Sequence, residues 1–186
     1  MYRIIYFLIC SVTILSSCSR DKDATDNTKQ VYERLHGKYK AVSSISSEAV
    51  DVNLDGTVST DVLSEIPDLA ECNLEILIVS KDKFLLIQSW PEQYVGYPEP
   101  AGYDPSLGVN YARQGVLRTF SLDETNNMLE VHADTYQVAE RFVFPSAVTI
   151  EGAETIKIVF SKKLYTSAGW KIATITTTYK RYTMAT

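Results

Sequence analysis

Short strands dominate the pattern of apolar and polar positions from Gly37 to the end of the chain. Apolar side chains alternate with polar ones, or gather in β-branched and aromatic runs, and turn-forming residues separate the runs. Helical spacing is confined to residues 29–36 and 60–66. The pattern predicts strands at residues 39–46, 74–79, 84–90, 114–122, 129–134, 141–150, 155–165 and 170–182.

The connections between these predicted strands are short, which favours antiparallel neighbours. Residues 74–79 and 84–90 are separated by a four-residue turn and form a predicted hairpin. Eight strands joined in this way are enough to close a barrel around a packed or ligand-filled interior. We therefore expect one all-β domain at residues 30–186, an antiparallel barrel or half-barrel of about eight strands with one or two short helices.

The N-terminus carries the pattern of a secretory signal peptide. Arg3 precedes an apolar run at residues 4–15, which is shorter than the roughly 20 apolar residues of a transmembrane helix. The run ends in Leu15-Ser16-Ser17-Cys18, which resembles the lipobox that lipoprotein signal peptidase cleaves. This predicts a signal peptide at residues 1–17 and a lipid anchor in the membrane at Cys18. The alternative is an ordinary signal followed by a chance cysteine.

A polar segment follows this cysteine. Residues 19–29 contain no large apolar side chain, so they bury too little surface to offset the entropy lost on ordering. Residues 18–29 are therefore interpreted as a lipidated, flexible tether that holds the domain off the membrane. The expected location is the cell envelope, at the outer membrane, on either its periplasmic or its surface face.

Charge and cysteine content narrow the classes of function. The formal net charge is −5 and no basic cluster occurs, which argues against nucleic acid as a partner. Of the three cysteines, Cys10 leaves with the signal peptide and Cys18 takes the lipid. Cys72 then has no disulfide partner within the chain, and it is interpreted as a small buried hydrophobe, with a reactive thiol as the alternative.

Segment 51–61 matches the first half of an EF-hand calcium loop. Oxygen-bearing side chains stand at positions 1, 3 and 5, and Gly56 at position 6 allows the sharp turn. The candidate Ca²⁺ ligands are Asp51, Asn53, Asp55, Thr57 (through its carbonyl) and Asp61.

Position 12 of this loop departs from the EF-hand pattern. It is Val62, where an EF-hand has a bidentate Glu, and Asp61 and Glu65 lie one residue early and three residues late. A calcium site is therefore incomplete unless Asp61, Glu65 or a distant residue completes it. The alternative is a turn in which the Asp and Asn side chains accept hydrogen bonds from nearby backbone amides.

The order of these features resembles the lipocalin-like lipoprotein family of bacteria. Segment 35–43 resembles the Gly-x-Trp opening strand of lipocalins, with Tyr39 in the place of the Trp, and the 51–61 loop and Cys72 follow in the family's order. The resemblance implies an eight-stranded barrel with an apolar interior and no catalytic machinery. It also implies a basic residue on the last strand, which is either Lys180 or Arg181.

Residues 90–111 form a segment rich in proline and aromatic side chains. It holds four of the six prolines, and long loops in compact domains tend to be functional or disordered. Tyrosine and tryptophan supply amphipathic contact area, so a platform for a sugar or an aromatic ligand is one interpretation. The other is a loop whose aromatic side chains cover one end of the barrel. The candidate ligand-binding residues are Trp90, Tyr94, Tyr97, Tyr103 and Tyr111.

An enzyme is the least favoured class of function. The chain has only two histidines, His36 and His132, and no serine-hydrolase, zinc-protease or phosphate-loop motif. The leading hypothesis is a non-catalytic, lipid-anchored envelope module that holds an apolar or glycan ligand, in the barrel or at the aromatic segment. The second hypothesis is a structural or adaptor subunit that contacts envelope proteins, stiffened by calcium, with no small ligand.

Overall fold

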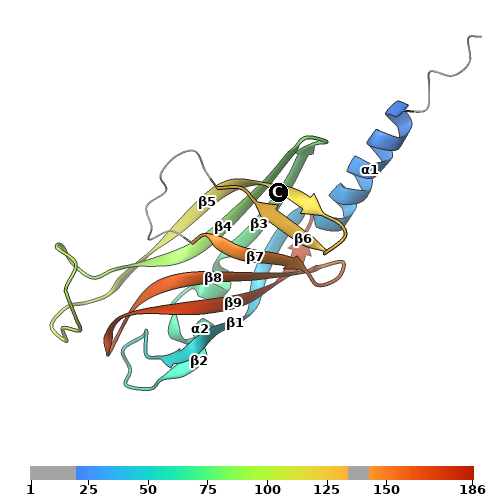
Figure 1. Ribbon diagram of the computed structural model, residues 1–186. Coiled ribbons are helices and arrows are strands. Elements are labelled where there is room, and N and C mark those ends of the chain that lie inside the picture. The colour runs from blue at the N-terminus through green and yellow to red at the C-terminus, as the bar shows by residue number, and fades with distance from the viewer. Residues whose placement is uncertain (1–19, 134–142) are drawn as a thin grey trace, which may run out of the picture.

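The computed structural model describes residues 20–133 and 143–186 as a β-barrel with a helix that projects from one end (Figure 1). Its strands are β1 (Gly37–Val50), β2 (Ser59–Asp61), β3 (Asn73–Ser80), β4 (Lys83–Tyr94), β5 (Asn110–Asp123), β6 (Met128–Val131), β7 (Pro145–Ile150), β8 (Thr155–Thr166) and β9 (Gly169–Thr183). Its helices are α1 (Arg20–Leu35), α2 (Val62–Glu65) and the 3₁₀ turn η1 (Leu69–Glu71). The predicted signal peptide, Cys18, residue 134 and residues 141–142 lie outside the described residues.

All the strand pairs of this barrel are antiparallel. The order is β1-β3-β4-β5-β6-β7-β8-β9, and β9 pairs with β1 to close the circle. The short strand β2 lies outside the circle and pairs with the far end of β1. The fold class expected from the sequence is therefore confirmed, as a closed barrel and not a half-barrel.

Several strands differ from their predicted bounds. β4 continues past Trp90 to Tyr94, because its pairing with β3 ends at Gln88 and Pro91 then lies on an open edge where its missing N–H is tolerated. β5 therefore begins at Asn110 instead of residue 114. β6 ends at Val131 and β7 begins at Pro145, both shorter than predicted, since the two share a single ladder pair between Met128 and Thr149.

The N-terminal helix is longer than the sequence pattern predicts and includes residues 20–29 of the predicted tether, while residues 18 and 19 lie outside the described residues. α1 begins at Arg20, whereas the pattern placed the start of a helix at residue 29. The buried side chains of Val31 and Leu35 fix the last turns against the barrel. Once a helix is nucleated, each further residue adds one hydrogen bond, and residues 20–29 contain no glycine or proline to stop it. The prediction considered burial alone and missed this elongation.

The interior of the barrel is filled by inward-facing side chains of every second residue on β8 and β9. Trp90 packs edge-on against Phe160, with their ring centroids 5.1 Å apart, and Phe84 lies 5.6 Å from Phe120. Cys72 is fully buried in the same core, and burial raises the pKa of its thiol, against a lowering by Arg113. The interpretation of Cys72 as a buried hydrophobe is confirmed.

Candidate functional site

Residues 95–109 connect β4 to β5 at one end of the barrel, and we call them the rim loop (Figure 1). The two strands stay paired as far as Tyr94 and Asn110, so the loop starts from a regular hairpin. Inside the loop the Asp104 carboxylate accepts hydrogen bonds from the hydroxyl and the backbone N–H of Ser106, and these bonds lower the pKa of Asp104. The loop therefore has ordered local structure of its own.

Hydrogen bonds tie the rim loop to the hairpin of β8 and β9. The indole Nε1 of Trp170 donates to the carbonyl of Pro100 at 2.9 Å. The hydroxyl of Tyr165 accepts from the backbone N–H of Asp104 at 2.8 Å and contacts the carbonyl of Gly102 at 3.4 Å. Because these bonds reach three points along the loop, the loop is held in one arrangement.

A charged and aromatic cluster lies where the loop meets the hairpin. Lys163 Nζ is 3.1 Å from Glu99 Oε2 and 4.2 Å from the ring centroid of Trp170. The Trp170 ring packs edge-on against Tyr165 at 5.1 Å. The cluster therefore offers an ammonium group, a carboxylate and aromatic rings within one small region.

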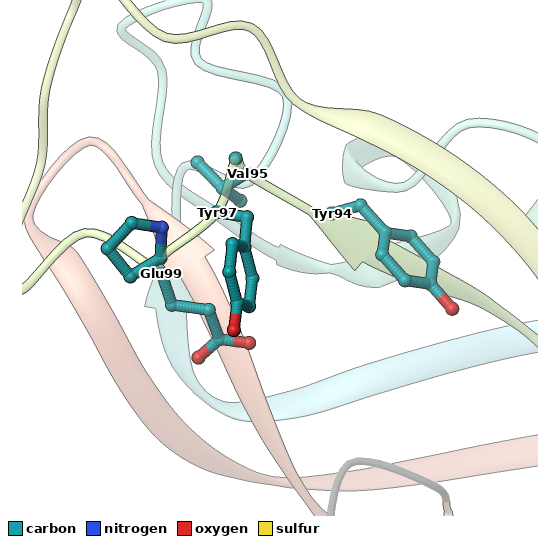
Figure 2. Close-up of a pocket in the computed structure, with 6 residues that line it drawn as sticks. Tyr94, Val95, Tyr97 and Glu99 are labelled. Atoms are coloured by element: carbon teal, nitrogen blue, oxygen red, sulfur yellow. The ribbon is translucent and has the colours of Figure 1, made fainter.

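A pocket of about 520 Å³ opens on the first part of the rim loop (Figure 2). Its lining residues are Tyr94, Val95, Gly96, Tyr97, Pro98 and Glu99. The side chain of Tyr97 is fully exposed. In Figure 2 it lies beside the side chain of Glu99, and the Tyr94 ring points away from both. The pocket can therefore present one free aromatic face next to a carboxylate.

The structure does not gather the five predicted aromatic residues into one platform. Trp90 is buried in the barrel, and Tyr111 is half-buried on β5, where its hydroxyl donates to the carbonyl of Val52 at 3.1 Å. Tyr103 packs on Tyr165 at 6.1 Å, away from the pocket lining. Of the five, only Tyr94 and Tyr97 line the pocket, so an aromatic platform made by all five is not formed.

Sequence reasoning missed the contribution of the last hairpin to this site. The sequence pattern predicts Trp170 only as the start of a strand. It indicates no site role for Tyr165, Lys163 or Glu99. A signal was present, because Tyr165 and Trp170 flank the turn that joins β8 to β9 and form a cross-strand pair. Nothing in the pattern, however, shows that a loop about 70 residues earlier returns to this turn.

The barrel interior is not wholly apolar, in contrast to what the family resemblance implies. Lys162 and Glu92 form a buried ion pair. The amide of Gln88 lies 3.5 Å from the hydroxyl of Tyr179, whose pKa is raised by burial. Arg118 is buried with its guanidinium 4.9 Å from the centroid of the Phe144 ring. Bulky and charged side chains thus occupy parts of the interior.

Side chains of the 51–57 loop accept hydrogen bonds from backbone amides of the same turn. Asn53 Oδ1 accepts from the N–H of Asp55 at 3.0 Å, and Asp55 Oδ1 accepts from the N–H of Thr57 at 2.7 Å. Asp61 lies away from this turn and caps α2, accepting from the N–H of Leu63 at 3.1 Å. Within residues 20–133 and 143–186, no three His, Cys, Asp or Glu side chains are grouped to hold a metal ion.

His132 lies in an exposed polar group at the end of β6. Its two ring nitrogens are each 3.2 Å from a hydroxyl, of Thr119 and of Ser121. Glu130 contacts Ser121 at 3.1 Å and not the histidine ring. This differs from a nucleophile–base–carboxylate relay, in which the carboxylate orients the histidine.

Comparison with protein-family models, with curated proteins and with solved structures gives no match. The resemblance to lipocalin-like lipoproteins therefore stays a prediction from the sequence. In the part of the chain that the structure describes, no helix is long and apolar enough to span a membrane.

Proposed function

We propose that this protein is a non-catalytic binding module, lipid-anchored in the cell envelope, that recognises a glycan at the rim loop. The observation that carries the proposal is the fully exposed Tyr97 ring beside Glu99, in a pocket of about 520 Å³. Ligand sites combine apolar or aromatic surface with a few placed polar groups, and this pocket has both.

The chemistry of the pocket suits a sugar better than a purely apolar ligand. A sugar ring presents a face of C–H groups that packs on a tyrosine ring, while its hydroxyl groups seek charged partners. Glu99, which lines the pocket with Tyr97, supplies an acceptor, and its ion-pair partner Lys163 holds the carboxylate at 3.1 Å. An apolar ligand inside the barrel has less support, because Trp90, Phe160 and the pair of Glu92 with Lys162 occupy that space.

The fixed position of the rim loop also supports binding. Trp170 and Tyr165 hold the loop through its backbone, so little conformational entropy is lost when a ligand binds there. A binding site built on a loop that is held by a rigid scaffold is a common arrangement.

The location is proposed from the N-terminal sequence. Cys18 would carry acyl chains, and two or three chains give stable membrane anchoring where one is marginal. α1 would then act as a stiff spacer between the anchor and the barrel, about 1.5 Å long for each helical residue.

The test is a calorimetric titration of the full chain, in a detergent without sugar groups, with soluble tetrasaccharides of glucose and of N-acetylglucosamine. We expect one of them to bind, and Tyr97→Ala and Glu99→Gln to weaken that binding at least about tenfold, equivalent to 1.4 kcal/mol. Tyr182→Ala is the matched control, since Tyr182 is an exposed tyrosine on β9 outside the pocket.

Two results would contradict the glycan proposal. One is a loss of affinity in Tyr182→Ala as large as that in Tyr97→Ala. The other is that no tetrasaccharide gives a heat of binding and that native mass spectrometry of the purified chain shows the mass of the protein with no bound ligand. That pair of results would favour the second hypothesis, an adaptor subunit that contacts other envelope proteins.

A further inference from the structure

Two buried carboxylates accept hydrogen bonds from the backbone of the 51–57 loop. One belongs to the first residue of the loop and the other to a residue that follows the loop in the sequence. Asp51 opens the loop and is 2 % exposed, while Glu65 at the end of α2 is 3 % exposed. Asp51 Oδ2 accepts from the N–H of Gly56 at 3.1 Å, and Glu65 Oε2 accepts from the N–H of Val52 at 2.9 Å. Both acids are thus held by amides of the same turn.

Neither of these carboxylates is neutralised by a basic side chain. The ion pairs of the described residues involve other acids, and no Lys, Arg or His bonds to Asp51 or Glu65 there. Buried charges in proteins are normally paired or coordinate a metal ion. Two acids without a basic partner in one small turn therefore call for a cation.

The second oxygen of Asp51 gives an independent sign of a missing ligand. Oδ1 is buried and has no hydrogen-bond partner among the described residues. The other oxygen of the same carboxylate, Oδ2, accepts from the N–H of Gly56, so the turn holds this carboxylate in place. A buried acceptor without a partner loses its hydration and gains nothing in return, so it marks a place where an ion or water belongs.

We propose that the 51–57 loop and Glu65 bind a Ca²⁺ ion, with Asp51 Oδ1 and the Glu65 carboxylate as its charged ligands. Of the two nearby acids that the sequence offered to complete the loop, Glu65 is the one assigned here, because Asp61 is occupied at the start of α2. Ca²⁺ accepts neutral oxygens and water beside carboxylates, so Asn53 and the Thr57 carbonyl complete a site that contains fewer than three grouped acids. Mg²⁺ is a poor alternative because it demands near-ideal octahedral geometry.

This site is separate from the rim pocket, yet it lies at the same end of the barrel. The carbonyl of Asp51 accepts from the N–H of Ser167 in the β8–β9 turn at 3.1 Å. The carbonyl of Val52 accepts from Tyr111 at the start of β5 at 3.1 Å. A bound ion would therefore stiffen the strand ends that support the rim loop, without touching a glycan itself.

The experiment compares the thermal unfolding of the full chain in chelator, in Ca²⁺ and in Mg²⁺. With two carboxylates we expect weak binding, with a Kd of roughly 10⁻⁴ to 10⁻³ M. Ca²⁺ at ten times its Kd should then raise the Tm by about 3 to 6 °C, and Mg²⁺ should raise it much less. Asp51→Asn and Glu65→Gln should each abolish the Ca²⁺-dependent rise.

Asp123→Asn is the matched control, because Asp123 also accepts from two backbone amides of a turn but is exposed. It should keep the full Ca²⁺ response. If a variant fails to fold, the unaltered chain gives a second measurement. Tb³⁺ bound at the site should luminesce when Tyr111 is excited. Added Ca²⁺ should displace the Tb³⁺ and reduce this luminescence. Identical Tm values in chelator and Ca²⁺, or Tb³⁺ luminescence that Ca²⁺ does not reduce, would overturn the site. Neither result depends on sugar binding.

Discussion

Tyr39 and Arg181 lie opposite each other on β1 and β9, and together they bond the carbonyl groups that end α1. The hydroxyl of Tyr39 donates to the carbonyl of Leu35 at 2.7 Å. Arg181 Nη1 lies 3.0, 3.1 and 3.3 Å from the carbonyls of Glu33, Arg34 and His36. The last carbonyls of a helix have no partner within the helix. Here they accept hydrogen bonds from side chains of β1 and β9, the two strands whose pairing closes the barrel.

Arg181→Met should therefore loosen both the helix and the barrel. We expect a loss of unfolding free energy of about 2–3 kcal/mol, because several carbonyls lose a charged donor at the negative end of a helix. Lys180→Met, one residue away on an exposed position of the same strand, should change stability little. Urea denaturation followed by circular dichroism checks both, and equal losses in the two variants would refute the capping role.

The sequence predicts the parts of the fold that follow from local patterns, and it misses contacts between distant segments such as this capping. The alternation at residues 74–79 and 84–90 is local, so it predicts β3 to within one residue at each end and the start of β4 to within one residue, whereas β4 runs four residues further than predicted, to Tyr94. The family resemblance left Lys180 and Arg181 open, because the choice depends on which one faces the helix end. β2 was missed, since three residues are too few to show alternation. The contact of Trp170 with the rim loop joins distant segments, and no local pattern encodes it.

The stability of the protein should fall in mild acid because of His36. Its Nδ1 accepts from the N–H of Ile78 at 3.2 Å, and its Nε2 lies 3.3 Å from the hydroxyl of Thr186. Burial lowers the pKa of His36, Glu75 opposes the shift and Arg181 adds to it. The folded state therefore prefers neutral imidazole, so this contribution is complete above a pH of about 6.5 and declines as the pH falls below it.

Urea titrations of the full chain at a series of pH values test this. The decline that begins near pH 6.5 should be reduced in His36→Gln and unchanged in His132→Gln. The second variant is a matched control, because the chain has only two histidines and His132 is exposed. A pH profile that His36→Gln leaves unaltered would assign the decline to other groups.

The ion pair of Glu92 with Lys162 should show strong coupling between its members. Both side chains are almost fully buried, so removing one leaves the other charge in the interior without this partner. Lys162→Met should reduce the unfolding free energy by about 3–5 kcal/mol, and Glu92→Met should do likewise. The double variant should lose clearly less than the sum of the two. A double-mutant cycle by chemical denaturation measures this, and additive losses would show that the two charges act independently.

Gly169 should control the position of the rim loop. It adopts a φ of +85°, and a β-carbon added there would lie 3.3 Å from the backbone nitrogen of Tyr103. Gly169→Ala should therefore destabilise the fold by about 1–2 kcal/mol and move the loop away from Trp170. Gly108→Ala is the matched control within the loop, because its added methyl group meets open space. Trp170 fluorescence and the affinity for the tetrasaccharide should change in the first variant and not in the second. If Gly169→Ala keeps the native affinity, the fixed position of the rim loop is not what makes the pocket competent to bind.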